Sequence, residues 1–372
     1  MRRLILCLAL VVVFSFCVGL AAQAEEVLQA GESDDSLLAD LSKRVKFNGS
    51  LDLTYWDYEG DGYKDGVATF DLFEAYVAAS GEIAQDLNSY LEIRYEHGGD
   101  EIELRQGYMD WSIIEPVTAR FGKFYMPIGI YRIGYYNSLR KFVSVPLCIR
   151  LVSVIPWSDT GMELYGDIPI SQNGMSFKYE LAIVNGLNDE YVNPTDQGKV
   201  RAARQNMDNN TEKTIGGRIG FLPIEGLELG FSYNTGKYDD EGRYNLEFIA
   251  GDIAYTVGDL TIKGEYVQST AETSDDDITT DGYYIEASYI ALKEFWGMRY
   301  LEVAARYETI DPGQDLMDRF LLLEGQEAQA TSLALNISPK KHFLFKFEYQ
   351  FNTEDEPDLD NNAFLGQIVV DF

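Results

Sequence analysis

The feature that most constrains the fold of this chain is an alternation of apolar and polar residues with a period of two. It begins at Val45 and continues to the C-terminus. The clearest case is residues 343–351, where polar or aliphatic residues alternate with five aromatic ones, Phe343, Phe345, Phe347, Tyr349 and Phe351. A period of two is that of a strand whose two faces meet different surroundings. The chain is therefore expected to be all-β.

Sixteen segments with this character follow one another, near residues 45–57, 67–81, 87–96, 101–113, 116–124, 159–168, 174–185, 213–222, 227–237, 246–257, 260–270, 282–292, 299–309, 327–337, 342–353 and 362–372. One set of connections is short, with residues 85–86, 114–115, 223–226, 258–259 and 338–341. The other set is mostly long and acidic, with residues 58–66, 186–212, 271–281, 310–326 and 354–361. Outer-membrane barrels have short turns at one end and long loops at the other. A soluble sandwich has no reason to segregate its loops in this way.

The expected architecture is a closed antiparallel transmembrane β-barrel of about sixteen strands over residues 45–372. A strand in lipid finds no water for its backbone groups, so both edges of the sheet must pair and the sheet must close. A barrel of this size is wide enough to leave an aqueous channel. The polar face of each strand then meets water instead of a packed core.

Both ends of the chain fit export to the bacterial outer membrane. Residues 1–24 have the pattern of a cleaved signal peptide, with Arg2 and Arg3, an apolar run and a small-residue cleavage site. Residues 25–44 are polar and are expected to form a short periplasmic segment. The last strand resembles the sorting strand of outer-membrane barrels, with apolar side chains Phe364, Ile368, Val370 and Phe372. Barrel-assembly machinery, outer-membrane lipid and lipopolysaccharide are therefore expected partners.

One segment departs from the acidic character of the chain, which carries 30 Lys and Arg against 61 Asp and Glu. Residues 116–158 contain no acidic residue, and their bases are Arg120, Lys123, Arg132, Arg140, Lys141 and Arg150. Residues 125–158 also contain apolar stretches that a loop surrounded by water would not need. We therefore expect residues 125–158 to fold into the barrel as a constriction loop. Rings of Arg or Lys favour anions in pores, and guanidinium groups suit oxyanions such as phosphate.

Two other interpretations of this segment remain open. Its bases could pair with acidic residues of the opposing pore wall, which would give a transverse field of mixed charge. The candidate residues of that wall are Glu92, Arg94, Glu96 and Glu103. The segment could also be a surface loop with no role in the pore.

The composition offers little for catalysis, metal binding or nucleic-acid binding. The two histidines, His97 and His342, are predicted at opposite ends of the barrel and cannot share a site. Cys7 and Cys17 leave with the signal peptide, so Cys148 is the one cysteine of the mature chain. A net charge of −31 argues against nucleic acid, whose phosphates need a basic face. No catalytic residue, metal or cofactor is expected.

Several short motifs resemble the phosphate-selective porin O/P type of Gram-negative outer-membrane porins. They are Ala119–Gly129 (ARFGKFYMPIG), Gly217–Pro223 (GRIGFLP), Glu228–Tyr233 (ELGFSY), Gly264–Tyr266 (GEY), Ala304–Asp311 (AARYETID) and Val369–Phe372 (VVDF). This resemblance implies a sixteen-stranded barrel, a homotrimer, and diffusion of small anions. The chain departs from the family pattern because its loop is richer in Arg and its overall charge is far more acidic. The resemblance therefore supports a porin more strongly than a phosphate channel.

The sequence thus predicts a porin that gives passive diffusion of small hydrophilic solutes, with a bias toward anions such as phosphate as a further hypothesis. The alternative is a structural or adhesive outer-membrane barrel with an occluded pore. In that case the acidic surface loops of the barrel would be its interaction surface.

Overall fold

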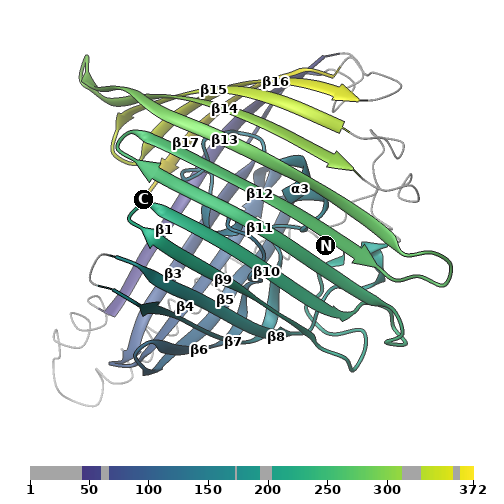
Figure 1. Cartoon of the computed structure of the whole chain (residues 1–372). Coiled ribbons are helices and arrows are strands. Elements are labelled where there is room, and N and C mark those ends of the chain that lie inside the picture. Colours follow the sequence, from purple (N-terminus) through teal and green to yellow (C-terminus); the bar gives the residue numbers. More distant parts are fainter. Residues whose placement is uncertain (1–43, 60–66, 172–173, 193–202, 312–327, 355–360) are drawn as a thin grey trace, which may run out of the picture.

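The computed structural model describes residues 44–59, 67–171, 174–192, 203–311, 328–354 and 361–372. One sheet contains every strand (Figure 1). The strands are β1 (Val45–Tyr58), β2 (Thr69–Asp71), β3 (Glu74–Ala84), β4 (Leu87–Glu96), β5 (Glu101–Ile114), β6 (Val117–Tyr125), β7 (Ser158–Pro169), β8 (Ser176–Val184), β9 (Thr214–Ile224), β10 (Leu227–Lys237), β11 (Asn245–Val257), β12 (Leu260–Ala271), β13 (Ile278–Phe295), β14 (Met298–Asp311), β15 (Ala328–Lys340), β16 (Phe343–Glu354) and β17 (Ala363–Asp371).

The sheet closes into an antiparallel barrel in which neighbours in sequence are neighbours in space. Closure is made by β1 and β17, whose register pairs Ser50 with Asp371. Both β2 and β3 pair with successive stretches of β1, so they are two parts of one strand of the wall. The barrel therefore has sixteen strands, which confirms the predicted fold class and strand number.

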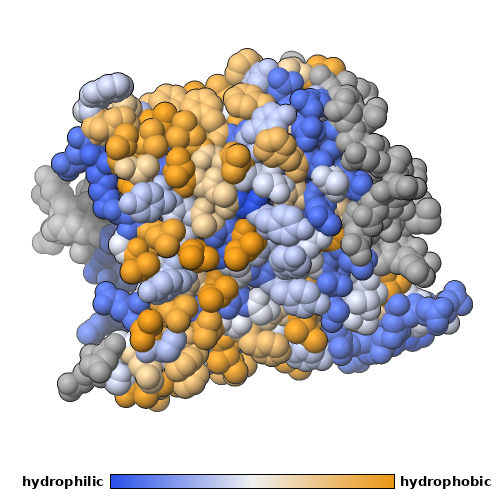
Figure 2. All heavy atoms as spheres, turned by 45° about the horizontal axis from the view of Figure 1, so that its top comes forward, coloured by the Kyte–Doolittle hydropathy of each residue, from blue (hydrophilic) through white to orange (hydrophobic). Residues whose placement is uncertain are grey.

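The two faces of the strands meet different surroundings. On β15 and β16 the outward side chains of Leu333, Phe347 and Phe351 are exposed, whereas the inward Ser332 and Lys346 are buried. Figure 2 shows apolar side chains spread over the outer surface of the strands, with hydrophilic residues toward the rims. This is the arrangement of a barrel whose wall contacts lipid. Among the described residues, no helix is long and apolar enough to cross a membrane.

The predicted strand positions agree with the structure to within a few residues, with one larger difference. The segment predicted at 282–292 is the longest strand, β13, which begins at Ile278 and pairs there with Ala271 of β12. The connection is therefore residues 272–277 instead of the expected 271–281. The reason is that Thr279 and Thr280 continue the alternation, because Thr270 and Thr279 face each other across the two strands.

The ends of the barrel differ as the loop lengths predict. The C-terminus lies at the end that carries the short turns (Figure 1). There the backbone of Phe372 exchanges two hydrogen bonds with Gly49, at 2.9 and 3.0 Å. In β17, Phe364 and Val370 lie on the exposed outer face together with the partly exposed Ile368. Its role as a sorting strand stays a prediction. The signal peptide (1–24) and nearly all of the segment 25–44 lie outside the described residues.

Candidate functional site

The long connection between β6 and β7 folds into the barrel, and residues 126–157 are called the inner loop below. It includes a 3-10 turn, η3 (Tyr131–Gly134), and a short helix, α3 (Leu147–Leu151). Figure 1 shows α3 inside the wall of strands, where it contacts β12, β13 and β14. The two ends of the inner loop are joined, because the Met126 N–H donates to the Trp157 carbonyl at 2.9 Å.

Apolar packing explains why this loop docks against the inner wall of the barrel instead of extending into water. Cys148, Ile149 and Val152 are fully buried, and the loop continues into a cluster with Trp157 and the β11 residue Phe248. Burying one such large side chain stabilises the folded state by about 1.5–3 kcal/mol. A loop that carries this many apolar residues is therefore more stable against the inner wall than in water.

Wall carboxylates hold the inner loop by its backbone. Glu265 of β12 accepts hydrogen bonds from the N–H groups of Ile130 (3.1 Å) and Tyr131 (3.0 Å). Glu348 of β16 accepts from the N–H of Val143 (2.7 Å) and from the N–H and hydroxyl of Ser144 (2.9 and 2.6 Å). Glu308 of β14 is a third such carboxylate, and it accepts a hydrogen bond from the N–H of Leu147, in α3, at 3.2 Å. Hydrogen bonds to ionised groups are about twice as strong as neutral ones.

A glycine makes the first of these contacts possible. Gly129 has a φ of +58°, a conformation that residues with a Cβ rarely adopt. A Cβ at this position would lie 1.7 Å from Oε1 of Glu265. The Gly129 N–H donates to the hydroxyl of Ser232 at 3.0 Å. The turn that enters the barrel therefore needs glycine for its backbone angle and for space.

Four of the six predicted pore bases have polar partners. Arg120 pairs with Asp110 (2.8 Å) and Glu163 (3.1 Å), and Lys141 pairs with Glu302 (2.8 Å). The Arg132 guanidinium contacts Glu180, and the Lys123 ammonium donates to Asn206 at 2.9 Å. Carboxylates thus compensate three of these charges directly, but none of these carboxylates is among the predicted Glu92, Glu96 and Glu103.

The other two predicted bases have a different environment. Within the described residues, no carboxylate lies within ion-pair distance of Arg140 or Arg150. The Arg140 side chain is 5% exposed, and its guanidinium lies 5.5 Å from the centroid of the Tyr135 ring. Arg150, in α3, is exposed. In the described part of the chain, Arg140 and Arg150 are thus the two predicted bases that make no direct ion pair or hydrogen bond through their side chains.

Lys263 is a further basic residue at this place, one that was not predicted from the sequence. A small opening between the inner loop and the wall is lined by the cations of Arg140, Lys141 and Lys263, and also by Glu286, which is the neighbour of Lys263 across β12 and β13. The Lys263 ammonium lies 3.7 Å from the position that a Cβ would take on Gly134 of the loop. We call Arg140, Lys141 and Lys263 the basic pocket. The alternation of residues 260–267 places Lys263 on the same face as Glu265. That pattern was the sequence signal from which an inward position of Lys263 could have been predicted.

Three of the four residues of the predicted opposing wall, Glu92, Arg94 and Glu96, are buried, whereas the Glu103 side chain keeps 31% exposure. Glu92 is fully buried and accepts from the hydroxyl of Tyr136, in the inner loop, at 2.7 Å. Arg94 pairs with Glu96 and, at 3.0 Å, with Glu103. Of these four predicted residues, Glu92 forms a hydrogen bond with the inner loop.

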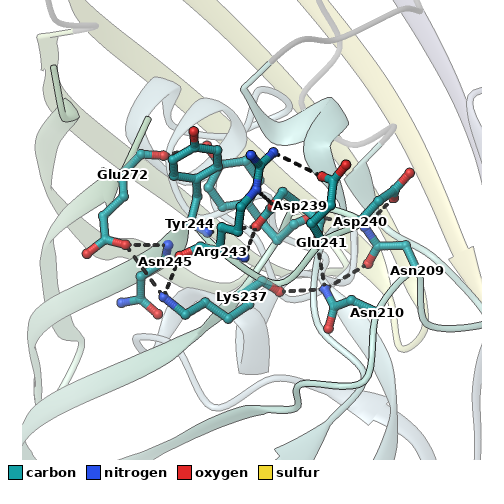
Figure 3. A network of polar contacts seen from close by, with 11 residues as sticks. Asn209, Asn210, Lys237, Asp239, Asp240, Glu241, Arg243, Tyr244, Asn245 and Glu272 are labelled. Carbon is teal, nitrogen blue, oxygen red and sulfur yellow. Dashed lines mark hydrogen bonds and ion pairs between the residues drawn. The ribbon is translucent and has the colours of Figure 1, made fainter. Parts of the chain in front are cut away.

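The outer rim carries a second polar network (Figure 3). Asp239, between β10 and β11, accepts from the N–H groups of Arg243 and Tyr244, both at 2.7 Å. Asn209 donates to Asp240 at 2.9 Å, which joins residues 203–213 to this turn. Burial opposes ionisation of Asp239, but the two N–H donors and the Arg243 guanidinium outweigh it and hold the pKa of Asp239 below its ordinary value.

The histidines lie as predicted, far from each other. His97 is at the end of β4, beside the long loops, and its Nδ1 lies 2.6 Å from Asp71. His342 is in the short turn between β15 and β16 at the other end of the barrel. In the described part of the chain, no group of three or more His, Cys, Asp or Glu residues could hold a metal ion.

Comparisons with known proteins agree with this geometry. An uncharacterized protein of Aquifex aeolicus (strain VF5) is 23% identical over 366 residues, which cover 90% of this chain and 81% of that protein. An anion-selective porin from Comamonas acidovorans has a TM-score of 0.61 at 12% identity, over 88% of this chain and 99% of that one. OprB of Pseudomonas putida has a TM-score of 0.59 at 11% identity, over 91% and 96% of the two chains.

The structural similarities show the fold of outer-membrane porins, at identities too low to carry more than the fold. The family evidence comes from the sequence. The model of the phosphate-selective porin O and P family matches residues 198–370, from the loop before β9 to the end of β17. This match confirms the resemblance over the second half of the barrel, where it covers the motifs Gly217–Pro223, Glu228–Tyr233, Gly264–Tyr266 and Ala304–Asp311.

Proposed function

We propose that this protein is a passive diffusion channel of the outer membrane for small hydrophilic solutes, and that the basic pocket gives it a preference for anions. The observation that carries the proposal is the position of Arg140 and Lys263 on either side of one opening. Neither has a carboxylate at ion-pair distance among the described residues. In a water-filled pore, such cations favour anions, while Arg120 and Arg132, which pair with wall carboxylates outside the basic pocket, contribute a mixed field.

The remaining expectations are part of the same proposal. Export through a cleaved signal peptide (1–24), contact with lipopolysaccharide and insertion by barrel-assembly machinery fit an outer-membrane channel. A homotrimer is the expected assembly, and the trimer form of OmpT from Vibrio cholerae, a barrel of similar fold with a TM-score of 0.56, offers a precedent. A channel also fits better than an enzyme, because the two histidines lie at opposite ends of the barrel.

The test of the anion preference is the reversal potential of the purified protein in planar bilayers across a KCl gradient. We expect wild-type protein to prefer chloride, and the double variant Arg140→Gln/Lys263→Gln to shift the potential toward cations. The matched control is Lys293→Gln, because Lys293 is an exposed base near the short-turn end of β13 that pairs with Asp259. A cation preference that the double variant leaves unchanged would refute the role of the basic pocket.

Liposome swelling separates a channel from the alternative of an occluded adhesive barrel. A diffusion channel admits small sugars and salts at a rate that falls with their size. If folded protein in liposomes admitted neither, the adhesive interpretation would replace this proposal.

A further inference from the structure

The inner wall of the barrel is not equally accessible around its circumference. On β14 and β16, which pack against the inner loop, the side chains of Arg306 and Glu348 are fully buried. On β5, β6 and β8 the inward side chains of Asp110, Arg120 and Lys178 keep 17%, 18% and 40% exposure. Inward side chains that remain accessible from the lumen are therefore found on β5, β6 and β8.

Tyrosine rings lie on the inner face of this part of the wall. Tyr90 of β4 and Tyr108 of β5 stack with ring centroids 5.2 Å apart and an interplanar angle of 27°. The Arg120 guanidinium lies 4.0 Å from the Tyr108 ring centroid and 4.7 Å from that of Tyr165, on β7. Four neighbouring strands thus contribute one row of stacked flat groups, in which Tyr108 contacts both Tyr90 and Arg120. We call Tyr90, Tyr108, Arg120 and Tyr165 the tyrosine row.

Hydrogen bonds hold the outer rings of this row in place. The Tyr90 hydroxyl donates to Glu92 at 2.6 Å, and the Tyr165 hydroxyl donates to Asp110 at 3.0 Å. Tyr136 of the inner loop donates to the same Glu92, which places a further ring at the constriction end of the row. Because the hydroxyls are bound, the rings lose little conformational entropy when a solute packs on them.

The charged groups of the row form direct ion pairs, which distinguishes the row from Arg140 and Lys263 of the basic pocket. Arg120 is compensated by Asp110 and Glu163, and Glu92 lies 3.4 Å from the Arg105 guanidinium. A surface of flat apolar groups edged by fixed donors and acceptors suits a neutral ring-shaped solute with one apolar face and hydroxyls around its edge. These are the properties of a cyclic sugar.

We propose that the tyrosine row is a contact site for cyclic sugars along the permeation path. It rests on the proposed function, because a sugar must be able to enter the lumen. The C–H face of the sugar packs on the rings of Tyr90 and Tyr165, and its hydroxyls exchange hydrogen bonds with Asp110 and Arg120. The site binds weakly and so guides sugars through the channel instead of retaining them.

The experiment compares glucose with sorbitol, an acyclic polyol of similar size, by liposome swelling and by sugar-induced current noise in planar bilayers. We expect wild-type protein to admit glucose faster than sorbitol. Packing against an aromatic ring is worth about two- to tenfold in affinity. Tyr90→Leu/Tyr165→Leu should therefore lower the glucose-to-sorbitol ratio and the glucose-induced noise by at least about twofold. Tyr165→Phe, which keeps the ring, should retain most of the preference.

The control is Tyr289→Leu, because Tyr289 is half exposed on the outer, lipid-facing side of β13. Heat-modifiable mobility on gels confirms that each variant is folded. If folded wild type admits glucose and sorbitol equally and the leucine variants behave like Tyr289→Leu, the sugar site is refuted while the channel stands. If wild type admits neither solute and conducts no ions, the proposed function fails together with this inference.

Discussion

Replacing Gly129 by alanine is expected to release the first part of the inner loop from the barrel wall. The added Cβ would lie 1.7 Å from Oε1 of Glu265 and would require a φ near +58°. Loss of two hydrogen bonds to a charged group costs about 3–6 kcal/mol, and the left-handed backbone costs about 1–2 kcal/mol more. The contacts of Glu348 and Glu308 remain, so we expect local release of residues 129–135 and an intact barrel.

Three measurements on one preparation test this expectation. Single-channel conductance should rise, open-channel noise should increase, and Cys148, which is fully buried in α3, should react faster with a maleimide. The matched control is Gly258→Ala, because Gly258 has nearly the same φ, +57°, and a Cβ added there would meet no atom within 4 Å. If Gly129→Ala and Gly258→Ala gave the same conductance, noise and labelling rate, anchoring by Glu265 would be the wrong account of the loop.

Three further predictions concern other contacts of the loops. Arg306→Met should leave Glu308 and Glu348 buried without their cation and destabilise the docked inner loop by about 3–5 kcal/mol. Thermolysin should then cleave the loop at lower urea concentrations than in wild type, and an unchanged urea concentration for cleavage would contradict this. Glu348→Gln keeps the shape of the side chain but removes the charge that binds the backbone of Val143 and Ser144. The inner loop should then be held less firmly and the open-channel current noise should increase. Noise equal to that of wild type would argue that the charge is unimportant. In the folded protein the pKa of Asp239 lies below its ordinary value of 3.8. The stability that Asp239 gives the rim is therefore present above pH 3.8 and is lost as the pH falls through the lower pKa of the folded state. Hydrogen exchange of residues 239–244 should detect this loss in wild type, and an identical acid response in Asp239→Asn would refute the role of Asp239.

The strands could be predicted from sequence because each carries its own evidence. The alternation of residues 343–351 or 227–237 is visible without knowing any neighbour, and β10 begins and ends as predicted. The fold class followed from loop lengths, which are also local. The late start predicted for β13 shows the limit: Ile278 belongs to the strand because Ala271 pairs with it across the turn.

The site could be predicted only in outline. The absence of acidic residues in 116–158 indicated which segment would enter the barrel. It could not reveal the partners, because Lys141 and Glu302 are 161 residues apart and meet only through the closure of the barrel. Lys263 was missed for the same reason: a single Lys on an alternating strand is commonplace until the inner loop is placed beside it.

The wall carboxylates bind amide groups that every residue other than proline possesses. The side chains of residues 130, 131 and 143 can therefore change without loss of these bonds. Mutation can thus change side chains of the inner loop while its backbone stays anchored to the wall, so related barrels can differ in solute preference through a few loop substitutions.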